Sequence, residues 1–338
     1  MPEAPVSPEY ILSLANGFAA TRCLLSAVEF DLFGRLAVGP ADLTTLEKDL
    51  GLHPRASRDF LDTLVALGLV EREDGLYANT PPAAAYLVRD GELSIVGLLE
   101  MLDRRLYGYW TGLSDALRSG RPQNELRHGG ESLFTALAAD PPRQRQFLRA
   151  MTALSRKANQ AIARRFPWQG FRSFADLGCA EGDLALQIAL AHPHLQGTGF
   201  DLPSVRPAFQ DHVTRHGAAD RLRFQAGDFF ADPLPPVDVL CFGHILHDWS
   251  LDQRKALIAR AHAALPPDGA LIIYDAMIDD AREANLHALL MSLTMLIETP
   301  AGADYTGADC QAWLREAGFR EVRCERLGGA DSMVVGFV

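Results

Sequence analysis

The segment Gly243-His-Ile-Leu-His-Asp-Trp-Ser250 carries two histidines beside an acid and a tryptophan. It follows a short apolar run that is typical of a buried strand, so we expect it at the carboxyl edge of a sheet, where ligands bind. A histidine is the natural base for removing a phenolic proton near neutral pH, since the reference pKa of its side chain is about 6.5. Flanked there by Asp248 and Trp249, His247 is predicted to be a catalytic base.

A metal site is the alternative interpretation of this segment. His244 precedes His247 by three positions, and His287 is a further candidate ligand. Closely spaced histidines are commonly incidental, and the acids at the strand ends have a simpler use in binding a cofactor. We therefore expect no metal ion.

A glycine-rich turn lies upstream, in Phe174-Ala-Asp-Leu-Gly-Cys-Ala-Glu-Gly-Asp183. The pattern indicates a strand that turns into a helix, and Gly178 and Gly182 let the backbone turn tightly and approach a ligand. Ala180 stands where a full G-x-G-x-x-G motif has its middle glycine. By itself, therefore, the loop indicates only a nucleotide-like ligand.

Two acids downstream narrow the choice of ligand. Asp201 ends a second strand and can accept both ribose hydroxyl protons. Asp228 ends a third strand and is followed by Phe229, so it can bind an adenine amino group while the ring covers a face of the base. A dinucleotide is the main competitor, but Glu181 and Asp183 would repel its pyrophosphate. They suit a cofactor that carries an ammonium group and a sulfonium.

Strands and helices alternate from about residue 172 to the end of the chain. Strands are predicted at 173–177, 197–201, 222–226, 237–242, 270–275, 321–326 and 332–338. Helices are predicted at 183–191, 205–216, 250–265 and 305–317. This pattern predicts an α/β fold, with a mostly parallel sheet covered on both faces and an antiparallel edge.

The N-terminal part is predicted to be mainly helical. Helices at 41–50 and 57–70 precede a hairpin at 71–78 that turns at Asp74-Gly75, which is the order of a winged helix. Such a module either packs against a second subunit or reads DNA. We expect no nucleic-acid partner, because acids offset the arginines of the second helix and the chain's net charge is −11.

The composition is that of a globular protein. The chain has 338 residues, 48% hydrophobic and 22% charged, which favours two domains. Its five cysteines form no C-x-x-C pair. The N-terminus lacks the pattern of a signal peptide, and no apolar run approaches the ~20 residues that span a bilayer. We therefore expect a cytoplasmic protein with no membrane partner.

At these residues the chain resembles the small-molecule O-methyltransferases of the caffeic acid and acetylserotonin type, above all their bacterial natural-product branch in secondary metabolism. The resemblance covers nearly the whole chain and is carried by DLGCAEGD, FDLP, GDFF, HDW and PAGADYT. It implies a Rossmann-like domain that binds S-adenosylmethionine (SAM), preceded by a winged-helix dimerisation domain. It also implies a homodimer, because the N-terminal helix of such families swaps into the partner.

The resemblance implies roles for individual residues. Catalysis would use His247 as base, Asp275 to orient its imidazole and Asp304 as a second acidic support. The cofactor would be bound by Ser155, Gly178, Asp201, Leu202, Asp228, Phe229 and Trp249. The acceptor pocket would be lined by Met151, Met295 and Thr299. Two departures stand out: the family often has glutamate at both acidic supports, and plant members usually have a cofactor-contacting lysine where Gly243 stands.

We predict three parts: a dimerisation domain at 1–100, a helical region over the substrate at 101–165 and the SAM-binding catalytic domain at 166–338. The predicted reaction moves a methyl group to a hydroxyl of a small aromatic or polyketide-like acceptor. Three alternatives stay open: methylation at carbon or nitrogen, a relative that keeps SAM but performs another reaction, and a winged-helix regulator that senses SAM.

Overall fold

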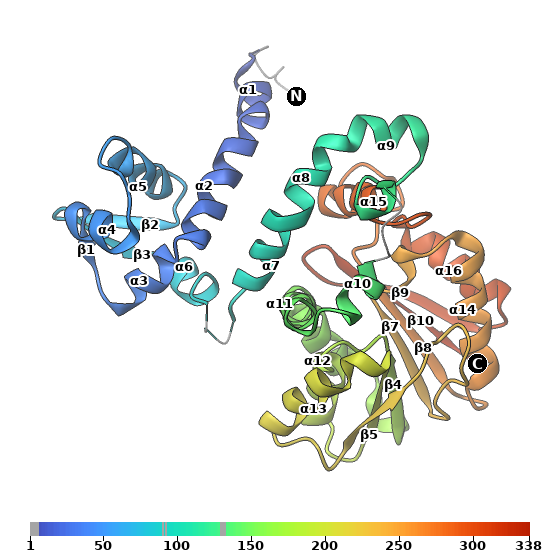
Figure 1. Ribbon diagram of the computed structural model, residues 1–338. Helices are drawn as coiled ribbons and strands as arrows, with labels where there is room; N and C mark the ends of the chain where they lie inside the picture. Colours follow the sequence, from blue (N-terminus) through green and yellow to red (C-terminus); the bar gives the residue numbers. More distant parts are fainter. Residues whose placement is uncertain (1–6, 90, 92, 129–132) are drawn as a thin grey trace, which may run out of the picture. The chain divides into compact units, whose positions relative to one another are not determined.

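A computed structural model describes residues 7–89, 91, 93–128 and 133–338. The first six residues, on which the expectation of no signal peptide depends, lie outside the described residues. So do residues 129 and 130 of the segment 120–130, whose glycine, proline and asparagine content predicts a loop. The chain forms two compact units, Met1–Arg104 and Arg105–Val338 (Figure 1). The three-part division of the chain stays a prediction.

The first unit is mainly helical. Its helices are α1 Glu9–Ala15, α2 Gly17–Glu29, α3 Leu32–Val38, α4 Leu43–Leu50, α5 Ser57–Ala66, α6 Pro81–Tyr86 and α7 Val96–Met101. Its strands are β1 Ala41–Asp42, β2 Val70–Glu73 and β3 Leu76–Asn79, in the order β1-β3-β2. The predicted hairpin turns where expected, because Asp74 and Gly75 both adopt the positive φ that a two-residue turn requires.

The N-terminal helices differ from the expectation in one respect. The stretch Glu9–Glu29 is 21 residues long, with a mean hydropathy of 1.4, so by length and composition it is sufficient to cross a membrane. The expectation that no apolar run is this long was wrong. Helix α1 has no buried residue, and Ile11 and Leu14 are 67% and 71% exposed. This helix therefore presents an apolar surface.

The second unit contains a seven-stranded sheet among its described residues. Its strands are β4 Ser173–Leu177, β5 Gln196–Asp201, β6 Leu222–Ala226, β7 Val239–Gly243, β8 Ala270–Asp275, β9 Glu321–Gly328 and β10 Asp331–Phe337. They are ordered β6-β5-β4-β7-β8-β10-β9, and only β10 runs antiparallel to its neighbours β8 and β9. The strands thus lie within a residue or two of their predicted positions.

Helices cover both faces of this sheet. The helices of the unit are α8 Tyr107–Tyr109, α9 Leu113–Ser119, α10 Leu133–Ala138, α11 Pro141–Arg165, α12 Asp183–Ala191, α13 Arg206–Arg215, α14 Leu251–Ala264, α15 Leu286–Glu298 and α16 Gly307–Glu316. Alternate residues of each central strand enter two separate cores, one beneath α11–α13 and one beneath α14 and α16. Figure 1 shows α12 and α13 on one side of the sheet and α14 and α16 on the other.

The strand order places the chemistry. The chain leaves β4 in one direction to β5 and β6, and returns to β7 on the other side of β4. This reversal is the point where open α/β sheets bind ligands, outside the carboxyl ends of the strands. The loops after β4, β5, β6, β7 and β8, which carry most of the predicted site residues, therefore gather at one edge.

Gly243 is required by the packing at this edge. It pairs with Tyr274 of β8. A Cβ atom on residue 243 would overlap the Tyr274 ring, closer than any real contact allows. The Tyr274 hydroxyl donates to Asn159 Oδ1 over 2.7 Å, which holds the ring in place. The Tyr274 ring thus fills the space that the Cβ atom of a lysine at position 243 would need.

We predict that Gly243→Ala destabilises the protein by roughly 1–3 kcal/mol, as overpacking of a core does. Denaturant unfolding measures the loss, with Gly170→Ala as control because a Cβ there meets nothing within 4 Å. Adding Tyr274→Leu should recover part of the loss. Equal stability of the two alanine variants would contradict the packing argument.

Candidate active site

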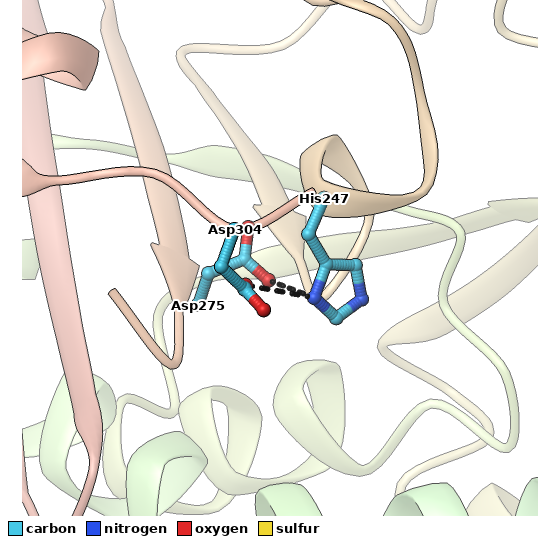
Figure 2. Close-up of side chains that lie close together, drawn as sticks. All are labelled: His247, Asp275 and Asp304. Atoms are coloured by element: carbon cyan, nitrogen blue, oxygen red, sulfur yellow. Dashed lines mark hydrogen bonds and ion pairs between the residues drawn. The ribbon is translucent and has the colours of Figure 1, made fainter. Parts of the chain in front are cut away.

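His247 lies against two buried carboxylates. It sits in the short helix η6 Leu246–Asp248, which follows β7, and its Nδ1 is 3.2 Å from Asp304 Oδ1 and 3.4 Å from Asp275 Oδ1 (Figure 2). Asp275 ends β8, and Asp304 lies in the segment between α15 and α16. All three residues are buried, so the structure brings the three predicted catalytic residues together.

The charges of this cluster compensate one another. Burial lowers the pKa of His247, but the charges of Asp275 and Asp248, with Asp304, raise it to about 10. Burial raises the pKa of Asp275 as well, yet His247 and its other partners hold it below the usual value, so Asp275 remains an anion. Burial also raises the pKa of Asp304, against the pull of His247. A carboxylate facing Nδ1 keeps a proton on that nitrogen, so Nε2 is the nitrogen that gains or loses the second proton.

Two further contacts complete the surroundings of the imidazole. Tyr305 donates its hydroxyl to Asp275 Oδ2 over 2.5 Å, which fixes the carboxylate plane. Asp248 places Oδ1 3.7 Å from His247 Nε2. Burial raises the pKa of Asp248 to about 6, although His247 opposes this shift.

Arg254, on α14, joins two loops of the candidate site and was not predicted from the sequence. Its guanidinium donates to the backbone oxygens of Trp249 (2.8 Å) and Ala303, and lies over the Tyr305 ring. It thereby ties the loop of His247 to the loop of Asp304. The signal was present: Arg254 occupies the apolar stripe of its helix with Leu257, Ile258 and Ala261, where a charge needs a special reason.

The loop of Asp304 is fixed by its own backbone. The Thr299 hydroxyl donates to Met295 O and accepts from Gly302 N, at 2.8 and 2.7 Å. Ala303 N donates to His247 O over 2.9 Å. The Thr299 hydroxyl is therefore used in this turn, so it positions the loop, and its predicted place in the acceptor pocket can involve only its other atoms.

The glycine loop has the shape of a cradle. Gly178 has φ +77°, and a Cβ there would overlap the Ile245 side chain. Ala180, which replaces the middle glycine, nevertheless adopts φ +49°, the left-handed conformation that glycine favours. Its N–H donates to Asp201 Oδ2 over 2.9 Å. The alanine therefore retains the turn at the cost of some strain.

Asp201 is prepared to accept further hydrogen bonds. Besides Ala180 N, it accepts from Leu202 N over 2.7 Å, which leaves lone pairs on both oxygens. Burial raises its pKa to about 6 against these two bonds. Asp176 lies below the loop, where burial and the charges of Asp201 and Asp183 raise its pKa to about 8. The cradle and the under-satisfied carboxylate fit an adenosyl group whose ribose hydroxyls donate to Asp201.

The two acids around Gly182 bind side chains of helix α11. Asp183 is buried and bound by Asn159 (2.8 Å) and Arg156 (3.2 Å), both on α11. Glu181 accepts from Thr152 of the same helix over 3.0 Å. Both side chains thus hold α11 against the loop, and the charge of Asp183 is paired with Arg156, whereas Glu181 meets only a hydroxyl.

The remaining predicted cofactor residues lie on the loops beside this cradle. Phe229 and Trp249 pack edge to face, with ring centroids 6.2 Å apart. Asp228 is exposed, and its Oδ1 accepts from Phe230 N within the same turn. Leu202 is 39% exposed, next to Asp201. Three loops thus offer apolar surface and acceptors in one region.

The other predicted residues come from helices. Ser155 is buried on α11, one turn after the half-buried Met151, and Met295 is buried on α15. Helix α15 was not predicted from the sequence. No contact among the described residues identifies an acceptor for any of the three, so their roles stay predictions.

A metal ion has a geometric place in the cluster. One ligand atom each from His247, Asp275 and Asp304 lies within 4.8 Å of the others. Neither His244 nor His287 belongs to that group among the described residues, so the histidine set considered from the sequence does not assemble there. The absence of a metal stays a prediction.

Family models match both units of the chain. An O-methyltransferase domain matches residues 110–320, and an O-methyltransferase dimerisation domain matches residues 12–89. Among curated proteins, the chain is 45% identical to the tetracenomycin polyketide synthesis 8-O-methyl transferase TcmO of Streptomyces glaucescens, over 97% of this chain and 96% of that protein. It is 38% identical to the N,N-dimethyltransferase OxyT of Streptomyces rimosus, over 96% and 95%.

A solved structure gives the same result. Human N-acetylserotonin methyltransferase in complex with SAM superposes with a TM-score of 0.90 at 29% identity, over 100% of this chain and 99% of that chain. The comparisons confirm the fold class and the resemblance stated from the sequence. The chain belongs to the SAM-dependent O-methyltransferase family, and its cofactor is SAM.

Proposed function

We propose that this enzyme methylates a phenolic hydroxyl of a polycyclic, polyketide-derived aromatic acceptor, with His247 as the general base. The observation that carries the proposal is the buried contact of His247 Nδ1 with Asp304 and Asp275. The similarity to a polyketide 8-O-methyl transferase over nearly the whole chain supports the acceptor class. Methionines and aromatic rings near 107–110, 151 and 291–295 suit a flat apolar ring system.

The mechanism is a direct displacement. His247 takes the hydroxyl proton on Nε2 as the acceptor oxygen attacks, while Asp275 and Asp304 stabilise the imidazolium through Nδ1. The reference pKa of a phenol such as tyrosine is about 10, close to that of His247, so little free energy separates the two positions of the proton. SAM supplies an electrophilic methyl group on a sulfonium whose departing thioether needs no acid. Holding the reacting atoms in line contributes up to about 7–11 kcal/mol in favourable cases.

Binding of the cofactor is assigned to the cradle beside the base. Asp201 would accept from the ribose hydroxyls and Asp228 from the adenine amine, with Phe229 and Trp249 against the ring faces. Gly178 permits close approach of the methionine portion, and Ser155 would contact its carboxylate. Leu202 would cover the ribose side, and Met151, Met295 and Thr299 would border the acceptor.

An amine acceptor is the second candidate, favoured by the similarity to an N,N-dimethyltransferase. Boron tribromide removes the methyl group of an aryl methyl ether, the product of O-methylation, whereas an N-methyl product resists this reagent. Mass spectrometry of the treated product therefore separates the two functions.

We further propose a cytosolic homodimer built through a winged-helix first unit. Its match to a dimerisation domain and the exposed apolar side chains of α1 support the dimer. All five cysteines are free, which suits a reducing compartment. On this account, the apolar stretch Glu9–Glu29 packs against a second subunit and does not enter a membrane.

The first prediction from this proposal concerns the base. His247→Gln should lower kcat with a phenolic acceptor by roughly 10²–10⁴-fold, the range for general-base help, and leave the Kd for SAM within a few fold. His194→Gln, remote from the cluster, is the control. Turnover by His247→Gln at the wild-type rate would show that His247 is not the base.

The second prediction concerns pH. Ribose hydroxyls require an ionised Asp201, whose pKa is about 6, so protonation at lower pH competes with SAM. The Kd for SAM should therefore rise as pH falls below 6, approaching about tenfold per unit. Calorimetry at pH 4.5–8 measures it. Asp201→Asn should bind SAM weakly and without this pH dependence; if its pH profile equals the wild type's, Asp201 is not the responsible group.

The third prediction concerns assembly. Ile11→Lys with Leu14→Lys places two charges on the exposed face of α1 and should convert the dimer to monomers in sedimentation velocity at micromolar concentration. Leu190→Lys, at a 52% exposed leucine of the second unit, should stay dimeric. A dimeric double variant, or a wild type that floats with lipid vesicles, would argue against this interface.

A further inference from the structure

Asp275 lies between two histidines, of which the proposed mechanism uses only one. Its Oδ1 is 3.4 Å from His247 Nδ1 and 3.5 Å from His244 Nδ1. Its Oδ2 is occupied by the Tyr305 hydroxyl. Oδ1 has no partner of full hydrogen-bond geometry among the described residues. The negative charge on this one oxygen therefore acts on both imidazole rings.

The position of His244 is built into the fold. Its N–H donates to Tyr274 O over 3.0 Å, which extends the pairing of β7 with β8 by one residue. Its backbone takes φ +53°, the left-handed region that few residues other than glycine enter without strain. Its ring packs edge-on against the Tyr274 ring, with centroids 5.2 Å apart. The strained backbone and the ring packing together turn the imidazole toward Asp275.

The other side of His244 faces a second carboxylate. Its Nε2 is buried without a hydrogen-bond partner in the described chain and lies 4.0 Å from Asp331 Oδ1, at the start of β10. The imidazole thus stands between Asp275 and Asp331. The steps assigned so far to His247 and to the cofactor cradle make no use of this arrangement.

We propose that His244 is a positioning residue for methyl transfer. It directs Asp275 Oδ1 toward His247, and the negative charge of Asp275 then acts on both histidines. The inference rests on the proposed function of His247 as base. His244 acts through Asp275 and takes no part in bond making. Because His244 Nδ1 also faces Asp275 Oδ1, the carboxylate stabilises the protonated form of His247 less than it otherwise would. His247 can therefore release the proton gained in one turnover before the next.

The direction of the effect follows from the surrounding charges. His244 faces Asp275 of β8 and Asp331 of β10. His247 also faces Asp304 and Asp248, and the charge of His287 acts on Asp331. Without the donor at position 244, Asp275 acts on His247 with its full charge. The pH at which His247 loses its proton then rises, and less neutral base is present at pH 7–8.

The test compares His244→Gly with His244→Asn. Both residues tolerate the left-handed backbone, but only asparagine keeps an N–H donor near the place of Nδ1. Ring ¹³C NMR of histidine-labelled, full-length protein saturated with S-adenosylhomocysteine follows the titration of His247, assigned with His247→Gln. The glycine variant should titrate at higher pH than wild type, and the asparagine variant close to wild type. Equal midpoints in wild type and glycine variant would overturn the inference.

A kinetic measurement provides the second readout. For each unit by which the midpoint rises, kcat/KM with a phenol below that midpoint should fall about tenfold, while affinity for S-adenosylhomocysteine is unchanged. A purely structural role would lower the thermal midpoint with no shift of the pH profile, which overturns the inference. If His244→Gly does not fold, His244→Phe takes its place, because it keeps a ring against Tyr274 but has no donor; an upward shift of the His247 titration is expected, and no shift contradicts the proposal.

The two hypotheses fail differently. A wild type that forms no methyl ether with any phenol contradicts the proposed function, while the titration of His247 still reports its coupling to His244. A wild type that methylates phenols, with a His247 titration that is indifferent to position 244, leaves the proposed function standing and removes His244 from it.

Discussion

The structure of this enzyme depends on the burial of an imidazole with carboxylates at one edge of a sheet. An isolated buried charge costs more free energy than a domain's net stability, so such groups persist only if they compensate one another. His247, Asp275 and Asp304 do so through Nδ1, and the Tyr305 hydroxyl and the Arg254 guanidinium complete the shell. The compensation fixes the tautomer of the imidazole, and the tautomer decides which nitrogen meets the acceptor.

Parallel strands bring these groups together from distant parts of the chain. Residues that end β7 and β8 are adjacent because the strands are paired, and Arg254 of α14 joins the loop of His247 to that of Asp304. On the cofactor side, α11 is held to the glycine loop by Arg156 and Asn159 on Asp183. The base and the cofactor cradle therefore rest on the same rigid sheet, which limits the loss of alignment between acceptor and methyl group.

The sequence predicted what depends on local patterning. The strands of the second unit, and the acids and histidine at their ends, follow from apolar runs and glycines, and they were placed within a residue or two. Local patterns do not show which side chains pair with one another, because the partners are distant in sequence and meet only in the fold. Asp183 was expected to suit a cationic cofactor, and nothing in the sequence indicated that Arg156 pairs with its charge and Asn159 donates to it. The contacts of Arg254 depend in the same way on how α14 packs. The Tyr274 ring fills the space beside Gly243 only because β8 pairs with β7.

The central claim is that His247 takes the acceptor proton as the oxygen attacks, and the response of His247→Gln to phenols of different pKa tests it most directly. A phenol that is already ionised at the working pH needs no base, whereas a phenol with a pKa of about 10 does. Single-turnover methylation by His247→Gln should therefore fall roughly 10²–10⁴-fold below the wild type with the weakly acidic phenol, and by much less with the ionised one. An equal loss with both phenols would contradict the account.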